Sequence, residues 1–171
     1  MPDQGKLTFI IGGARSGKSA HAETLATALP SPWTYIATAE AYDDEMRERI
    51  AVHRSRRGEG WSTIDAPLDL AGALEALPDN QPVLVDCLTL WLTNHMLAEH
   101  DIEQECRRLT DVLLRPRGSW FVVSNEVGQG IVPDNALARR FRDAAGRLNQ
   151  QVAAIADTVL LMVAGLPLKV K

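Results

Sequence analysis

Cysteine is scarce in this sequence: among its 171 residues there are two, Cys87 and Cys106. Neither has a C-x-x-C partner or a histidine at metal-ligand spacing, which argues against a zinc site. A disulfide is not expected in a reducing compartment. We therefore predict that both cysteines are packing residues.

Long apolar runs are also lacking. The longest, Thr158 to Leu168, is too short and too interrupted by glycine and proline to cross a bilayer. The N-terminal residues MPDQGK contain no apolar region of the kind that signal peptides carry. We expect a cytoplasmic protein without a membrane span.

The chain has no excess of positive charge. Its net charge is −4, which gives no overall attraction to nucleic acid, although Arg54, Arg56 and Arg57 form a local basic cluster. Any polyanion that it binds should therefore be small. A chain of this length, with 46% hydrophobic and 23% charged residues, fits one globular domain over residues 1–171.

The sequence does contain a complete G-x-x-x-x-G-K-[ST] motif directly after an apolar run, Leu7 to Ile11. In such a loop the backbone N–H groups and the following helix N-terminus surround phosphate, the lysine contacts the terminal phosphates and the hydroxyl holds Mg²⁺. The motif predicts a nucleoside triphosphate and Mg²⁺ as ligands. The loop comprises Gly12, Gly13, Ala14, Arg15, Ser16, Gly17, Lys18 and Ser19.

Short apolar runs alternate with helical patterns along the rest of the chain. Alternation of this kind implies right-handed crossovers and a mostly parallel, doubly wound sheet flanked by helices, as in P-loop NTPases. The expected strands are 7–11, 33–37, 61–65, 82–86, 119–124 and 158–163, with 166–170 pairing as a C-terminal antiparallel hairpin around Gly165. The expected helices are 18–29, 43–56, 68–77, 88–99, 102–114 and 136–156.

Polar residues follow several expected strands, at the sheet edge where ligands bind in such folds. Asp86 ends the run VLVD and is a candidate for contact with Mg²⁺, directly or through water; the alternative is an N-cap of the next helix. Glu126 can accept a proton from a hydroxyl or position the metal, and an ion pair with Arg139 or Arg140 is an equally good interpretation.

His53 shares a helix face with Met46 and Ile50, which predicts that it emerges from the inward side near the end of helix 43–56. Neutral imidazole is a competent nucleophile toward phosphorus, and the adjacent arginines would stabilise charge on phosphate oxygens. A hydrogen-bonded core histidine is the alternative, and spacing alone slightly favours it. His95 and His100 are expected to be exposed or to cap helices.

Four segments resemble the bifunctional adenosylcobinamide kinase / adenosylcobinamide-phosphate guanylyltransferase family of cobalamin biosynthesis. The phosphate-loop segment is shared by many nucleotide enzymes, whereas the other three, in this order, are specific. The segments are GGARSGKS at 12–19, YIATAEAYDDEMRERIAVHR at 35–54, VLVDCLTLWLTN at 83–94 and VSNEVGQGIVPDNALARRFRDAAGRLNQ at 123–150.

The resemblance implies phosphorylation of the aminopropanol hydroxyl of adenosylcobinamide by a nucleoside triphosphate, then transfer of GMP from GTP through a histidine. That position is His53 here; relatives often carry two adjacent histidines, where this chain has Val52-His53. The resemblance also implies a trimer, to which apolar residues of 88–97 could contribute. Finally, it implies nucleotide contacts at Ala37, Thr38, Ala39, Arg54, Ser55, Arg56, Arg57 and Asp65.

Two other functions fit the phosphate loop alone. One is a simple small-molecule kinase in which His53 is structural, and the other is a nucleotide-dependent switch without its own substrate. The donor nucleotide of the kinase step, ATP or GTP, is left open by the residues.

Overall fold

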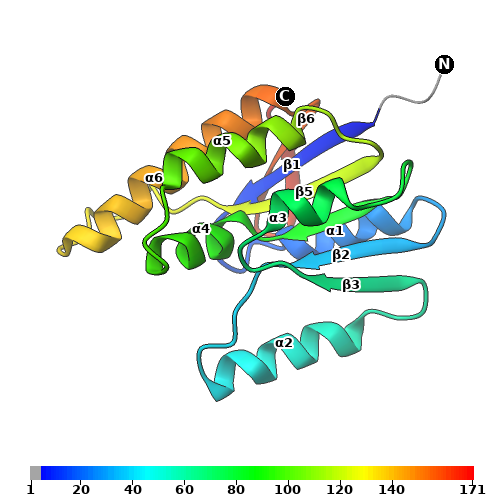
Figure 1. Ribbon diagram of the computed structural model, residues 1–171, viewed down its shortest axis with the longest axis horizontal. Helices are drawn as coiled ribbons and strands as arrows, with labels where there is room; N and C mark the ends of the chain where they lie inside the picture. The colour runs from blue at the N-terminus through cyan, green and yellow to red at the C-terminus, as the bar shows by residue number, and fades with distance from the viewer. Residues whose placement is uncertain (1–4) are drawn as a thin grey trace.

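A seven-stranded sheet forms the centre of the computed structural model, which describes residues 5–171 (Figure 1). Residues 1–4 of the polar N-terminus discussed above lie outside the described residues. The strands are β1 (Lys6–Gly12), β2 (Trp33–Ala37), β3 (Trp61–Asp65), β4 (Val83–Asp86), β5 (Ser119–Asn125), β6 (Thr158–Val163) and β7 (Leu166–Lys169). The helices are α1 (Lys18–Thr27), α2 (Asp44–Arg56), α3 (Leu70–Glu75), α4 (Leu88–Leu97), α5 (Ile102–Leu113) and α6 (Ala136–Ile155).

The strand order is β3-β2-β4-β5-β1-β6-β7, and every pair is parallel except the antiparallel hairpin β6–β7. The predicted doubly wound sheet and its C-terminal hairpin are thus confirmed. Because β1 lies between β5 and β6, the carboxyl ends of β1 and β5 lie side by side, with Gly12 paired to Asn125. This register places the phosphate loop beside the segment that contains Glu126.

The two faces of the sheet bury separate apolar clusters, because side chains alternate along each strand. Phe9, Val85 and Val122 belong to the cluster that α3, α4, α5 and α6 cover. Ile10, Leu84 and Val123 belong to the second cluster, to which α1 contributes Ala22 and Ala26. Small residues on α1 bring that helix, and with it the phosphate loop, close to the sheet.

Helix α2 lies apart from both layers and contributes no buried residue (Figure 1). The prediction that Met46, Ile50 and His53 form an inward face holds only in part: Met46 and Ile50 are half-buried, but His53 is exposed. Asp43 caps the helix through the Met46 amide at 2.7 Å, and its exposed ion pairs are local. The helix is stabilised by its own cap and charges rather than by the core.

The prediction that His95 is exposed or capping is also wrong. His95 is 2% exposed, and its Nε2 atom lies 3.0 Å from the Leu68 carbonyl oxygen while Nδ1 lies 2.9 Å from Nδ1 of the exposed His100. The neighbouring Trp91 donates to the same carbonyl at 2.9 Å. Helix α4 therefore turns its aromatic face inward, and of its large apolar residues Leu97 is the exposed one.

Both cysteines are buried free thiols, as predicted, and serve as packing residues. No helix within residues 5–171 combines the length and apolarity that a membrane span requires.

The buried His95 predicts how stability depends on pH. Burial lowers its pKa, and the hydrogen bond to Leu68 and the charge of Glu105 oppose this only in part. Below about pH 6.5 the unfolded chain binds a proton at this histidine, whereas in the folded chain the lowered pKa keeps the ring neutral. The free energy of unfolding therefore falls as pH decreases. We expect His95→Gln to flatten the dependence of the unfolding free energy on pH in that range, by at most about 1.4 kcal/mol per pH unit.

Urea denaturation between pH 5 and 8 measures this slope, and His21→Gln on α1 is the matched control. An unchanged slope in the His95 variant would contradict the assignment.

Candidate active site

The phosphate loop spans the gap between β1, which ends at Gly12, and α1, which begins at Lys18. A Cβ on Gly12 would lie 2.6 Å from the Ser16 hydroxyl and 2.8 Å from the Met162 carbonyl oxygen, so the turn requires glycine there. Gly17, at φ 92°, precedes the helix in the left-handed conformation. The two motif glycines are therefore explained by close approach and by backbone geometry.

The loop is braced by the β6–β7 hairpin. The Gly165 amide donates to the Ser16 carbonyl at 2.9 Å, and a Cβ on Gly17 would come within 3.2 Å of the Gly165 Cα atom. Sequence reasoning predicted the hairpin but missed this contact, because a hairpin pattern carries no information about what its turn touches.

Lys18 is 7% exposed, and its Nζ atom donates to the Gly13 carbonyl at 2.5 Å. Burial lowers the pKa of the ammonium group, and its electrostatic interactions with Cys87 and Asp86 oppose this. The side chain therefore lies across the loop in which phosphate is predicted to bind. A bound anion would place a negative charge next to this buried ammonium group and so stabilise its charged form.

Ser19 and Asp86, predicted separately from two segments, are brought together by the fold. The Ser19 hydroxyl donates to Asp86 Oδ2 at 2.8 Å, and the Tyr35 hydroxyl donates to the same oxygen at 2.9 Å. Asp86 does not cap α4, whose N-cap is Cys87, so the capping alternative is wrong. Hydroxyl and carboxylate oxygens beside a phosphate loop suit Mg²⁺, which is usually held by one or two such ligands plus substrate phosphates.

Tyr35 is a site residue that sequence reasoning missed. Its ring lies beneath Arg57, whose guanidinium carbon is 3.6 Å from the ring centroid, and its hydroxyl donates to Asp86. Burial, and after it the charge of Asp86 and this hydrogen bond, raise the pKa of the phenol. Among the described residues, the terminal nitrogen Nη1 of Arg57 is buried without a hydrogen-bond partner. Such an atom is a donor awaiting an acceptor.

The other predicted basic residues divide into two groups. Arg54 donates to both carboxylate oxygens of Asp65, at 2.6 and 2.7 Å, so these two predicted nucleotide contacts are paired with each other. Arg56 and His53 line a hollow of about 320 Å³ along α2. The Ser55 hydroxyl donates to the Val52 carbonyl within the same helix.

The segment after β2 is held against the start of α4. Thr38 is fully buried, and its hydroxyl donates to the Cys87 carbonyl at 2.7 Å and accepts from the Cys87 amide at 2.8 Å. Ala37 is buried and Ala39 is half-buried. The Thr38 side chain thus positions the backbone around Asp86.

Glu126 follows β5 beside the loop, and its amide donates to the Gly12 carbonyl at 2.9 Å. Its carboxylate accepts from the Gly128 amide at 2.7 Å. The Arg139 side chain instead donates to the Pro133 carbonyl. The carboxylate therefore shapes the 126–130 turn and lies at the same sheet edge as the phosphate loop.

A larger hollow, of about 880 Å³, lies at the other end of the strands. Its lining includes Lys6, Pro32, Pro82 and Ser119, which all lie at or next to the amino ends of strands. The phosphate loop, Thr38, Asp86 and Glu126 lie at or after the carboxyl ends of strands, and no predicted site residue lines this hollow.

Comparisons with known proteins identify the family of this chain. The model of the cobinamide kinase / cobinamide phosphate guanyltransferase family matches residues 8–170. The bifunctional adenosylcobalamin biosynthesis protein CobP of Pseudomonas aeruginosa is 46% identical over 95% of this chain and 96% of its own. The bifunctional protein CobU of Escherichia coli K12 is 40% identical, over 96% and 99% of the two chains.

Solved structures with low sequence identity support the fold. A Pyrococcus horikoshii OT3 protein described as project PH0250 superposes with a TM-score of 0.59 at 10% identity, over 98% of this chain and 87% of its own. An ATPase of a bacterial type III secretion system superposes with a TM-score of 0.55 at 14% identity, over 92% of this chain and 51% of its own.

Lys18 provides a test of the phosphate loop. We expect Lys18→Met to weaken binding of Mg·GTP by about 10- to 100-fold, because it removes charge-assisted hydrogen bonds to phosphate. The folded chain should keep its stability, since the change removes a desolvated charge. Isothermal titration calorimetry and urea denaturation measure the two effects, with Lys169→Met on β7 as the control. Unaltered affinity would contradict the assignment.

Proposed function

Since this chain belongs to the cobinamide kinase / cobinamide phosphate guanyltransferase family, we propose that one phosphate loop serves both of its reactions and that His53 carries the guanylyl group between them. The first reaction phosphorylates the aminopropanol hydroxyl of adenosylcobinamide. The second transfers GMP from GTP to that phosphate and gives adenosylcobinamide-GDP and pyrophosphate.

In the kinase step the loop amides and Lys18 hold the β- and γ-phosphates. The acceptor hydroxyl attacks the γ-phosphorus, the bond to the β-phosphate oxygen breaks, and the nucleoside diphosphate leaves. Glu126, beside Gly12 at the same edge, accepts the hydroxyl proton. Catalysis here is mainly positioning and charge stabilisation.

In the guanylyl step the same loop holds the β- and γ-phosphates as the leaving pyrophosphate. A nitrogen of His53 attacks the α-phosphorus and forms a P–N bond while the bond to the β-phosphate oxygen breaks. The phosphate of the corrinoid then attacks this phosphorus, and the P–N electron pair returns to the ring. The unpartnered guanidinium nitrogen of Arg57 supplies a donor for phosphate oxygens.

The environment of the histidines is the observation that carries this proposal. His95 and His100 are paired with each other, whereas His53 is exposed and lines a hollow together with Arg56. Helix α2 has no buried residues, so no core contact opposes its approach to the phosphate loop. A nucleophile on such a helix can meet the α-phosphate when GTP is bound and withdraw for the kinase step.

Ser19 and Asp86 are the proposed Mg²⁺ ligands, since they place two oxygens at the loop within hydrogen-bond distance of each other. The ion would neutralise charge on the phosphates and on the leaving group. Ala37, Thr38, Ala39, Arg54, Ser55 and Asp65 complete the proposed nucleotide contacts.

The corrinoid is the small-molecule substrate that the family implies. We also propose a homo-oligomer, a trimer by the family resemblance, whose neighbouring subunit helps to form the corrinoid site. The 97% exposed Ile131 and the 64% exposed Val132, close to Glu126 in sequence, are suited to such contacts. A cytoplasmic location stays a prediction.

Incubation with α-labelled GTP and Mg²⁺ tests the covalent step. We expect acid-labile, alkali-stable label on the wild type, exchange between GTP and pyrophosphate without acceptor, and neither in His53→Ala. The variant should retain γ-phosphate transfer to adenosylcobinamide, because the nucleophile is used only in the guanylyl step.

His21→Ala serves as the matched control and should label normally. Equal labelling of wild type and His53→Ala, or no labelling of either, would refute the histidine mechanism. Loss of both activities in His53→Ala would instead indicate a structural role.

Chelation by EDTA is expected to abolish both reactions. Asp86→Asn can still accept from Ser19 and Tyr35 but lacks the charge, so we expect the Mg²⁺ concentration for half-maximal activity to rise about 10-fold or more. A magnesium titration of the kinase rate measures this, with the exposed Asp143→Asn as the control. A titration curve identical to that of the wild type would remove Asp86 from the metal site.

A further inference from the structure

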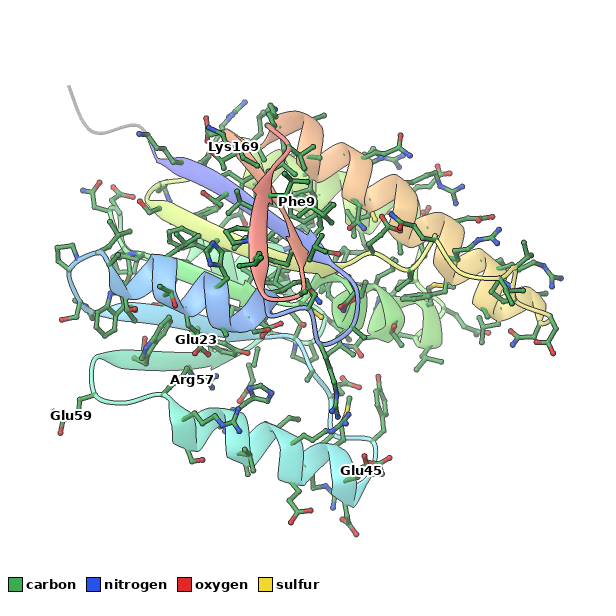
Figure 2. The ribbon with its side chains drawn as sticks, turned by 180° about the vertical axis from the view of Figure 1, so that it is seen from behind. Phe9, Glu23, Glu45, Arg57, Glu59 and Lys169 are labelled. Carbon is green, nitrogen blue, oxygen red and sulfur yellow. The ribbon has the colours of Figure 1, made fainter. Side chains whose placement is uncertain are left out.

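Glu23 is a charged residue of α1 that none of the roles above includes. It stands four residues after Ser19, one turn along the same helix face, and is half-buried. Its carboxylate therefore lies below the phosphate loop on the side of α1 where α2 and β3 are found. Figure 2 shows Glu23 and Arg57 close together in the space between these elements.

The charges around Glu23 are those of the guanylyl site. Arg57 is the C-cap of α2 and lies close to Glu23, and His53 stands four residues before it, one turn along the same helix. The charges of Arg57, Asp86, His53 and Arg56 also act on the Glu23 carboxylate. Desolvation raises the pKa of Glu23 and exceeds the lowering by Arg57. Because the carboxylate is desolvated and not fully stabilised by nearby positive charge, a hydrogen-bond donor that approaches it stabilises its ionised form.

The other carboxylates of the site are already committed. Asp86 accepts from Ser19 and Tyr35, and Asp65 accepts twice from Arg54. Within residues 5–171 the Glu23 carboxylate accepts no hydrogen bond and forms no ion pair. On its own helix His53 has Glu48, Arg49 and Arg56 beside the same hollow, but these groups move with it and cannot fix its ring against the sheet.

We propose, on the basis of the guanylyl transfer assigned to His53, that Glu23 is the positioning residue of that nucleophile. When α2 approaches the phosphate loop, the Glu23 carboxylate accepts a hydrogen bond from the ring N–H of His53 that points away from phosphorus. The opposite nitrogen then carries the lone pair and is aimed at the α-phosphate. The uncommitted carboxylate beside Arg57 carries this inference.

The chemistry needs such an acceptor because attack turns neutral imidazole into a cationic phosphoimidazolium. The ring donates its lone pair to the α-phosphorus, pyrophosphate leaves with the P–O electron pair, and the remaining N–H proton stays on the ring. The positive charges of the nearby arginines disfavour this cation. The negative charge of Glu23 counteracts them, because its carboxylate accepts a hydrogen bond from the ring N–H. On transfer to the corrinoid phosphate the P–N electrons return and neutral imidazole is restored.

Glu23→Gln keeps the shape and removes the charge. We expect the single-turnover rate of His53 guanylylation at saturating GTP to fall about 10- to 100-fold. We also expect the acidic limb of its pH profile to move to lower pH by about one unit, because a carboxylate beside imidazole raises the pKa of the ring. Glu23→Asp should recover part of the rate. The γ-phosphate transfer to adenosylcobinamide and urea stability should be unchanged.

Glu59→Gln is the matched control, since Glu59 lies in the loop beyond Arg57 and points away from the site (Figure 2). A Glu23→Gln protein that labels at the wild-type rate with an unshifted limb would overturn the proposal. A higher KM for GTP in both reactions, with the acidic limb of the pH profile unshifted, would also overturn the proposal. It would mean that Glu23 only pairs with Arg57. Failure of the wild type itself to form labelled His53 would refute the covalent mechanism, and is thereby distinguished from failure of the Glu23 proposal.

Discussion

One carboxylate oxygen joins the separate parts of the site. Asp86 Oδ2 accepts hydrogen bonds from Ser19 at the start of α1 and from Tyr35 on β2, and the Tyr35 ring supports Arg57. Each charge-assisted bond of this kind contributes about 1.5–3 kcal/mol. The phosphate loop, the middle of the sheet and the arginine after α2 are therefore aligned by contacts that converge on the end of β4.

Helix α2 differs from the other helices in how it is held to the rest of the chain. The sheet and five of its six helices bury apolar side chains, whereas α2 buries none and yet contains His53. Elements with few buried contacts open at low free-energy cost. This arrangement suits the proposed mechanism, in which the phosphates would stay in place while His53 approaches for the guanylyl step and withdraws for the kinase step.

Local signals in the sequence were sufficient for the loop and for most element boundaries. The glycine spacing at Gly12 and Gly17 follows from close approach and positive φ, and the apolar runs match the strands. The prediction for α2 failed at His53 for a clear reason: Met46, Ile50 and His53 are spaced as a helix face, but spacing cannot say how much of that face a neighbour covers. His95 was misplaced for the opposite reason, since its partner Leu68 lies 27 residues away.

The remaining site features depend on strand order, which no local pattern records. Tyr35 reaches Asp86 because β2 and β4 are neighbours in the sheet, although β3 separates them in sequence. Glu23 lies near Arg57 only once α2 and β3 have returned to the side of α1. Charge and residue type identified the candidates, whereas their juxtaposition required the tertiary fold.

The contact between Gly165 and Ser16 gives the site an order of assembly. The phosphate loop is synthesised before the β6–β7 hairpin whose turn braces it, and β1 pairs with β5 and β6. Long-range pairings of this kind form late, after the loop-closure entropy has been met. A nascent chain that already displays the whole G-x-x-x-x-G-K-S motif therefore lacks a shaped phosphate cradle until its final strands have joined the sheet.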